Sequence, residues 1–172
     1  MVKLHKKVWL WYGLALLVIG LDQLTKIWIS DAMVLGQSVI FTSFFNFTLL
    51  HNEGAAFSFL SSAGGWQRYA LGILALVVSV GLVVWIARIA AGKLWEPAAL
   101  ALVLGGALGN LIDRTLHGYV VDFIVVHYQQ HAWPAFNVAD MAISAGAIML
   151  VIDAFRSRHK AGEESTESLN KQ

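Results

Sequence analysis

Hydrophobic and polar positions divide the chain into four long apolar segments, separated by two stretches of a different pattern. The apolar segments cover about residues 8–30, 67–88, 97–113 and 137–155. An α-helix rises about 1.5 Å per residue, so about 20 apolar residues cross the roughly 30 Å hydrocarbon layer of a bilayer. We therefore predict four transmembrane helices, and Pro97 suits the first turn of the third.

The two intervening stretches, residues 31–66 and 114–136, lack this long apolar pattern. Residues 38–42 and 44–50 are rich in β-branched and aromatic side chains with polar residues between them, which predicts a strand, a turn and a strand. Residues 119–128 predict a further strand, and residues 52–60 predict a turn leading into a short amphipathic helix. The fold class is a mainly α membrane protein: a four-helix bundle with a small sheet and one short helix outside the membrane.

The amino-acid composition supports a membrane protein and excludes several kinds of site and partner. The 172 residues are 58% hydrophobic and only 13% charged, whereas a soluble domain carries about a quarter charged residues. The net charge of +1, without a basic stripe, predicts no nucleic-acid partner. The absence of cysteine excludes disulfides, thiolate metal sites and cysteine nucleophiles. We expect one integral membrane domain over residues 1–156 and a polar, disordered cytoplasmic tail over residues 157–172.

Basic residues fix the expected orientation. In a four-span topology one side carries most of them, namely Lys3, Lys6, Lys7, Arg88, Lys93, Arg156, Arg158 and Lys160. The other side has only Arg68, Arg114 and an inward Lys26. By the positive-inside rule we predict that both termini are cytoplasmic and that both intervening stretches lie on the outer face.

Polar residues inside the apolar pattern gather at one membrane leaflet in this topology. The outer ends of the predicted helices and the two outer stretches contain Asp22, Lys26, Asn52, Asn110, Asp113, Arg114, Asp122, Asn137 and Asp140. A carboxylate among apolar residues costs several kcal/mol unless it is paired, solvated or protonated. This convergence therefore predicts a functional site at the outer face.

Two of these acids, Asp122 and Asp140, are the candidate active-site pair. Asp140 also has a structural explanation, because Asn137 at a helix N-cap with an acid three residues later satisfies free amides and complements the helix dipole. No cap is needed for Asp122, which lies within an apolar strand. The pair therefore points to chemistry, while the cap remains an alternative for Asp140.

The other polar or small residues also have structural readings. Asp22 and Lys26 are four residues apart, which fits a self-neutralising pair with Lys26 snorkelling outward. Gly105 and Gly109 form a small-residue packing signal, for which helix packing is favoured over any chemical role. Arg114 is explained either by the site or as an interfacial charge.

Other catalytic arrangements fit less well. His127 and His131 lack the glutamate of a zinc-protease motif, and no serine nucleophile elbow occurs. The glycines at 105–109 lie within a predicted transmembrane helix, so they cannot form a phosphate-binding loop.

Five motifs in order resemble those of bacterial lipoprotein signal peptidase, the signal peptidase II family. The motifs are Asp22-Gln-Leu-Thr-Lys26, Asn52-Glu-Gly54-Ala-Ala-Phe57, Gly105-Gly-Ala-Leu-Gly-Asn110-Leu-Ile-Asp-Arg114, Val121-Asp122-Phe123 and Phe136-Asn137-Val-Ala139-Asp140. Each is weak alone, but five in order over residues 8–155 are specific.

The resemblance implies an aspartyl endopeptidase of the bacterial inner membrane. Its activity would be removal of the signal peptide from prolipoproteins, immediately before a cysteine that carries diacylglyceryl. Asp122 and Asp140 match the catalytic dyad, and which of them is acid and which is base stays open. The family positions that shape or support the site fall on Asp22, Lys26, Asn52, Gly54, Gly106, Asn110, Arg114, Asn137 and Ala139. The resemblance also implies a small periplasmic β cradle and a short periplasmic helix over a site near the periplasmic face. We expect a monomer that contacts membrane lipids and needs no metal or other cofactor.

Two other functions would also place polar residues inside a membrane bundle. Buried Asp, Lys and Arg in a helix bundle also occur in small ion- or proton-coupled carriers. A carrier should have polar groups reaching both leaflets or repeated halves, whereas the cytoplasmic halves of these segments are almost purely apolar. In a structural membrane subunit the polar cluster would only pair helices.

Overall fold

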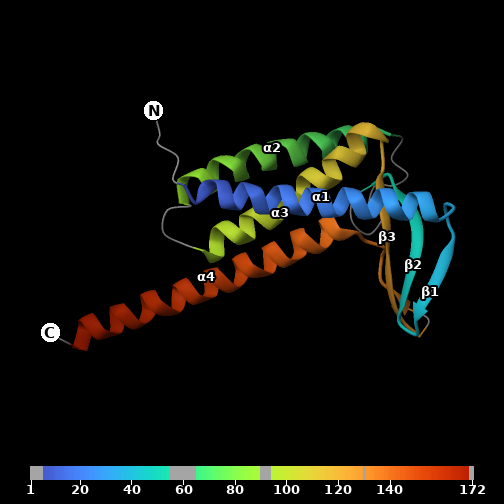
Figure 1. Cartoon of the computed structure of the whole chain (residues 1–172). Helices are drawn as coiled ribbons and strands as arrows, with labels where there is room; N and C mark the ends of the chain where they lie inside the picture. Colours follow the sequence, from blue (N-terminus) through green and yellow to red (C-terminus); the bar gives the residue numbers. More distant parts are fainter. Residues whose placement is uncertain (1–5, 55–64, 90–93, 130, 171–172) are drawn as a thin grey trace.

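The computed structural model describes residues 6–54, 65–89, 94–129 and 131–170, with side chains described as far as residue 156. Within these residues four long helices form a bundle and a small sheet crosses one end of it (Figure 1). The helices are α1 (Val8–Ala32), α2 (Gln67–Ile89), α3 (Trp95–Leu116) and α4 (Val138–Asn170). Each contains a stretch long and apolar enough to cross a membrane, which confirms the predicted mainly α membrane fold.

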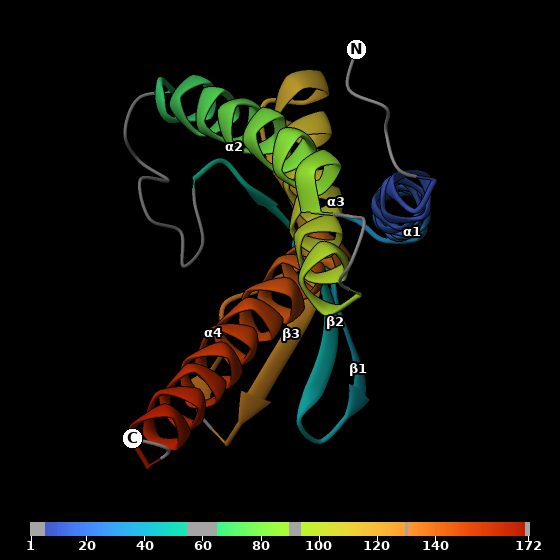
Figure 2. The same ribbon diagram turned by 90° about the vertical axis from the view of Figure 1, so that its left-hand side faces the viewer.

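α3 is the central helix of the bundle. It packs against α1, α2 and α4, while α4 starts beside α3 and diverges from the others toward its carboxyl end (Figure 2). Two close approaches depend on glycine: a Cβ on Gly105 would lie 2.7 Å from the Cβ of Val18 in α1, and one on Gly146 would lie 2.6 Å from the Ala99 carbonyl oxygen in α3. The predicted packing role of the small residues in α3 is therefore confirmed.

The helix bounds differ from the sequence prediction mainly in α4. α3 starts two residues before Pro97, so the proline occupies the first turn, where its missing N–H is tolerated. α4 was predicted to end near Phe155 and to be followed by a disordered tail, and this is wrong, because the helix continues to Asn170. Residues 157–170 contain Ala, Glu, Lys, Arg and Leu and no proline, so a helix already formed in the membrane extends through them.

The sheet is antiparallel, with strand order β1-β2-β3-β4. Its strands are β1 (Ser38–Thr42), β2 (Phe45–Asn52), β3 (Val120–Tyr128) and the short β4 (His131–Ala132). The strand, turn and strand predicted within residues 31–66 and the strand predicted within residues 114–136 are confirmed. The short helix predicted over residues 52–60 falls largely on residues 55–64, which lie outside the described residues.

Two apolar clusters hold these parts together. Near the end of the bundle away from the sheet, Val8, Ile86 and Leu100 are fully buried between α1, α2 and α3. Under the sheet, Ile29 of α1 packs with Leu49, Val121 and Phe123 of β2 and β3. The second cluster fixes the sheet on α1 and so sets where β3 carries its polar residues.

Large apolar side chains cover the outer surfaces of the bundle. On α1 and α2, Leu16, Leu24, Ile73 and Val77 are each between 63% and 68% exposed. Such a surface suits contact with lipid acyl chains rather than water.

Candidate active site

Polar side chains from five elements meet where the sheet crosses the bundle. Asp22 and Lys26 come from α1, Asn52 from the end of β2, Asn110, Asp113 and Arg114 from α3, Asp122 from β3, and Asn137 and Asp140 from the start of α4. The predicted set lies within one network of hydrogen bonds and ion pairs, joined by long-range contacts between segments far apart in the sequence.

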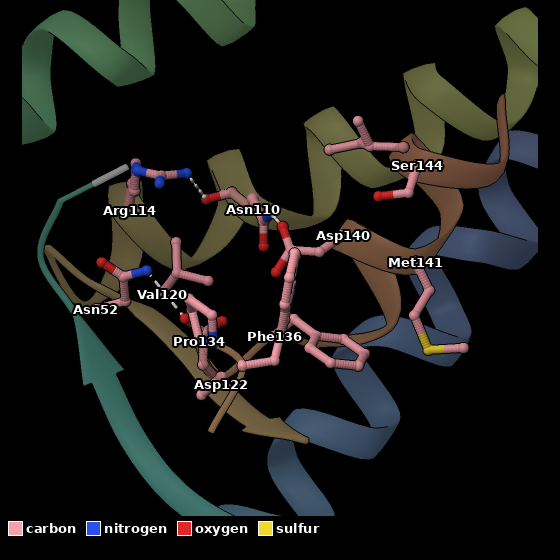
Figure 3. A pocket seen from close by; sticks show the side chains of 13 residues that line it. Asn52, Asn110, Arg114, Val120, Asp122, Pro134, Phe136, Asp140, Met141 and Ser144 are labelled. Carbon is pink, nitrogen blue, oxygen red and sulfur yellow. Dashed lines mark hydrogen bonds between the residues drawn. The ribbon is translucent and has the colours of Figure 1, made fainter. Parts of the chain in front are cut away.

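Asp122 and Asp140 lie on the same cavity (Figure 3). The cavity measures about 550 Å³, and its polar lining is Asn52, Asn110, Arg114, Asp122, Asp140 and Ser144. Its apolar lining includes Val120, Trp133, Pro134, Ala135, Phe136, Met141 and Ile143. The cavity therefore places two carboxyl groups in surroundings that are otherwise mainly apolar.

Asn137 connects the two carboxyl groups. Its side-chain Nδ2 donates to Asp122 Oδ1 at 2.7 Å, and its backbone N–H donates to Asp140 Oδ2 at 3.2 Å. Its Oδ1 in turn accepts the backbone N–H of Asp140 at 3.0 Å. This reciprocal pair is a capping arrangement at the start of α4. The cap leaves Oδ1 of Asp140 on the side of Asn110, which donates to it at 2.8 Å. The cap and a chemical role for Asp140 are thus compatible.

Asp122 is held from both sides by amides. Asn52 Nδ2 donates to its Oδ2 at 2.9 Å, opposite the bond from Asn137. The residue is only 3% exposed, because β3 lies between β2 and the start of α4. Burial, and next the charge of Asp140, raise the pKa of the Asp122 carboxyl from 3.8 to about 7, against the lowering effect of the two amide hydrogen bonds. Asp122 is therefore suited to hold a proton near neutral pH.

A buried ion cluster, formed by Lys26, Asp22 and Asp113, lies behind the cavity. Lys26 Nζ lies 2.8 Å from Asp22 Oδ2 and 3.0 Å from Asp113 Oδ2, and donates to Asn110 Oδ1 at 3.0 Å. The predicted Asp22–Lys26 pair is present, and the alternative in which Lys26 snorkels outward is wrong, because the side chain is 3% exposed and turns inward. Two carboxylates and an amide oxygen replace the water that the ammonium group loses on burial and so offset its desolvation.

This cluster holds the backbone just before each candidate catalytic acid. Asp22 Oδ1 accepts the N–H of Ala139 at 2.9 Å, one residue before Asp140. Asp113 Oδ2 accepts the N–H of Val121 at 3.0 Å, one residue before Asp122. Because Lys26 binds both carboxylates, it couples the positions of β3 and α4.

Glycines permit the close approach of α4 and α1 to α3 at this level. A Cβ on Gly106 would lie 2.3 Å from the Ala139 carbonyl oxygen, and one on Gly109 would lie 2.6 Å from Asp22 Oδ2. Gly106 and Ala139 therefore support the site by packing, not by side-chain chemistry.

Arg114 and Gly54 connect α3 to the end of β2. Arg114 Nη2 donates to the Gly54 carbonyl oxygen at 3.0 Å, and the Gly54 N–H donates to Asn52 Oδ1 at 3.0 Å. The contact orients Asn52, which in turn contacts Asp122. Arg114 also lines the cavity, so it is more than an interfacial charge.

Sequence reasoning missed two polar members of the network. Gln23 Nε2 donates to Asp113 Oδ1 at 2.9 Å and to the Gly109 carbonyl oxygen at 3.2 Å. Asp113 was noted as polar but was not assigned to the site. Both lie within the quoted motifs, and an amide or acid on an apolar helix face was the available signal. The apolar lining from Trp133 to Ile143 gave no such signal.

The geometry can support acid–base chemistry at a point between the two acids. In the described part of the chain, no group of three His, Asp or Glu side chains is arranged to hold a metal ion. What the cavity offers is one buried carboxyl group that favours its protonated form and a second at the amino end of a helix, which favours negative charge.

Comparison with known proteins gives one consistent result. A family model described as signal peptidase (SPase) II matches residues 14–156. The lipoprotein signal peptidase of Cellvibrio japonicus is 54% identical over 167 residues, covering 96% of this chain and 98% of the relative. That of Teredinibacter turnerae is 64% identical over 144 residues, covering 84% and 86%. A bacterial membrane enzyme solved by the in meso method at 2.3 Å resolution matches with a TM-score of 0.80 and 32% identity, covering 92% and 94% of the two chains.

These similarities extend over nearly the full length of both partners and include the fold. They give no support to the carrier alternative. The chain belongs to the signal peptidase II family of membrane proteases.

Proposed function

We propose that the protein is an aspartyl endopeptidase that removes the signal peptide of prolipoproteins immediately before a diacylglyceryl-modified cysteine. The observation that carries the proposal is that Asp122 and Asp140 share one cavity and are linked through Asn137. Membership of the signal peptidase II family supports the class of reaction and substrate.

In the proposed mechanism the dyad holds one proton before reaction. Asp140, at the amino end of α4, is the ionised member, and Asp122, whose pKa is raised to about 7, is the protonated one. Asp140 takes a proton from a water molecule as the oxygen of that water attacks the scissile carbonyl carbon. Asp122 gives its proton to the carbonyl oxygen, which produces a tetrahedral diol. The C–N bond then breaks: Asp140 gives the leaving amine the proton that it took from water, and Asp122 takes a proton from one hydroxyl of the diol as the carbonyl re-forms, so the dyad again holds one proton.

The remaining polar side chains keep the two acids in place during this cycle. Asn52 and Asn137 stabilise the charged form of Asp122 after it has given up its proton. Asp22 and Asp113, which Lys26 joins, each accept the backbone N–H of the residue just before one of the two acids. Such fixed groups need little rearrangement when charge develops, and this lowers the barrier.

The surface around the cavity supports the proposed substrate and location. Met141 and Ile143 line it on the α4 side, so acyl chains of a diacylglyceryl group would reach it directly from the bilayer. The basic residues Lys6, Lys7 and Arg88 lie at helix ends away from the sheet, and Arg156 lies where the apolar span of α4 ends. By the positive-inside rule these positions support cytoplasmic termini and a periplasmic site. We further propose that the enzyme acts as a monomer, without nucleic acid, metal or other cofactor, in the bacterial inner membrane.

The test compares Asp122→Asn and Asp140→Asn with Asp31→Asn, an exposed residue of α1 near the same end of the bundle. Purified proteins are incubated with a lipid-modified precursor and with the unmodified precursor. Each dyad variant should lose about 10³-fold or more in cleavage rate while still unfolding cooperatively in detergent at a temperature no lower than that of the wild type, and Asp31→Asn should cleave normally. Retained cleavage in either folded dyad variant would refute the dyad. Equal cleavage of the two precursors would refute the lipid requirement, and sensitivity to EDTA would point to a metal enzyme.

A further inference from the structure

A second cavity, of about 580 Å³, lies between the amino end of α2 and the carboxyl end of α3. These two helix ends lie side by side at the sheet end of the bundle (Figures 1 and 2). Its polar lining comes from Arg68, Tyr69, Arg114, Thr115 and His117, and its apolar lining from Ile73, Leu76, Leu111 and Leu116. No step of the proposed reaction takes place in this cavity.

The side chains that line this cavity make it positive, and the carboxylates that act on Arg114, those of Asp140, Asp122 and Asp113, lie outside it. No Asp or Glu is among its described lining residues. In the described part of the chain the ion pairs all involve Lys26, so neither Arg68 nor Arg114 has a carboxylate within 4 Å. Nε of Arg114 is buried and has no hydrogen-bond partner in the structure. The amino end of α2 and the carboxyl end of α3 contribute dipoles of opposite sign here, so the side chains decide that the site attracts an anion.

Arg68 is held in a defined place. Its guanidinium lies 4.5 Å from the centroid of the Tyr69 ring and donates to the Tyr69 hydroxyl. Gly118, whose φ is +85°, makes room for it, because a Cβ there would lie 3.1 Å from Arg68 Nη1. A preorganised guanidinium loses little entropy when it binds a planar or tetrahedral oxyanion with two parallel N–H groups.

The apolar wall of the cavity continues along the membrane-facing side of α2. Ile73 is 63% exposed and Leu76 is 53% exposed; they lie one turn apart and further along α2 than Arg68, within a helix long and apolar enough to cross a membrane. Leu116 on α3 is 69% exposed. A free inorganic anion would use only the basic end of this surface, whereas a lipid would cover both parts.

We propose that this cavity binds an anionic phospholipid of the outer leaflet. Its phosphate lies at Arg68 and Arg114, and one acyl chain follows Ile73 and Leu76. The ligand is thus a lipid of the surrounding membrane and not the substrate of the protease. Because Arg114 lines both cavities, the bound lipid also affects the orientation of Asn52 through Gly54.

Native mass spectrometry of the purified full chain tests this without any substrate, so the result does not depend on the proposed peptidase activity. The probes are short-chain phosphatidylglycerol, phosphatidylcholine of the same chain length, and inorganic phosphate. The variants are Arg68→Gln, Arg68→Lys and, as control, Arg88→Gln at the other end of α2. We expect phosphatidylglycerol to bind at least about tenfold more tightly than phosphatidylcholine, and Arg68→Gln to weaken it about tenfold.

Arg68→Lys should keep part of the affinity, since it retains the charge, and Arg88→Gln should keep nearly all of it. Equal binding of the two lipids, or equal weakening by Arg68→Gln and Arg88→Gln, would overturn the proposal. Binding of inorganic phosphate as tightly as phosphatidylglycerol would also overturn it, because the acyl chain would then contribute nothing. Thermal unfolding of each variant in detergent checks that a loss of binding is not a loss of folding.

Discussion

Replacement of Asn52 by alanine removes one of the two amide donors that stabilise ionised Asp122. The Asn52 Nδ2 to Asp122 Oδ2 distance is 2.9 Å, and Asp122 is 3% exposed, so water replaces this donor only in part. A hydrogen bond to a charged group contributes about 1.5–3 kcal/mol, and 1.36 kcal/mol corresponds to one pKa unit. Because Asn137 still donates, we expect the pKa of Asp122 to rise above its value of about 7 by about one unit.

The assay is the pH dependence of kcat/KM for a diacylglyceryl-modified peptide. In the proposed mechanism Asp122 gives the proton, so activity falls as Asp122 ionises. The alkaline limb should therefore move to higher pH by about one unit in Asn52→Ala. Asn46→Ala is the matched control, because Asn46 lies on the same strand and its Oδ1 has no hydrogen-bond partner in the structure.

The outcome also assigns the roles of the two acids. If the acid limb moves upward instead, Asp122 is the base and the proposed assignment is reversed. If neither limb moves while the protein remains folded, the ionisation of Asp122 does not control the rate, and the reasoning from the Asn52 hydrogen bond is refuted.

Three further predictions concern stability and the ion cluster. Gly106→Ala should lower the unfolding temperature in detergent and reduce cleavage, since its Cβ would lie 2.3 Å from a backbone oxygen of α4 and overpacking costs about 1–3 kcal/mol; Gly81→Ala, which meets nothing within 4 Å, should do neither. Lys26→Met leaves two buried carboxylates without their cation, so folded yield and cleavage should both fall, with a stability loss of about 3–5 kcal/mol; unchanged values would mean that the cluster does not organise the site. Asp122→Asn should be more heat-stable than the wild type by a margin that grows between pH 4 and 7 and is then constant. The pKa of Asp122 is raised from 3.8 to about 7 on folding, so the wild type loses stability as pH rises through that window. A margin independent of pH would contradict this.

The membrane-spanning helices follow from local sequence alone. A stretch such as residues 67–88 is apolar along its whole length, and the bilayer leaves the backbone no alternative but a helix of sufficient length. The two strands within residues 31–66 could also be predicted from the sequence, because polar residues lie among their β-branched and aromatic ones. The end of α4 could not be predicted from the sequence, since a polar composition fits both a disordered tail and a solvated extension of a helix.

The chemical content of the site was likewise present in the sequence. Carboxylates at 122 and 140 in apolar surroundings had to be accounted for, and the order of the surrounding motifs indicated the family. The sequence also left two readings of Asp140 open, as a partner of the helix cap and as a chemical group. In the structure it is a member of the cap, and it lines the cavity as well.

Only the tertiary structure decided how these residues connect. Lys26 reaches Asn110 across 84 positions, and Asp22 receives the N–H of Ala139 across 117. The binding of Lys26 to both Asp22 and Asp113, and the contacts of Asn137 with both Asp122 and Asp140, follow from where α1, α3, β3 and α4 come together. The sequence determines which segments enter the membrane and which polar groups they carry, because hydrophobicity and charge act locally. Which atoms bind one another depends on distances of about 3 Å between segments far apart in the chain, and only the packing of those segments fixes such distances.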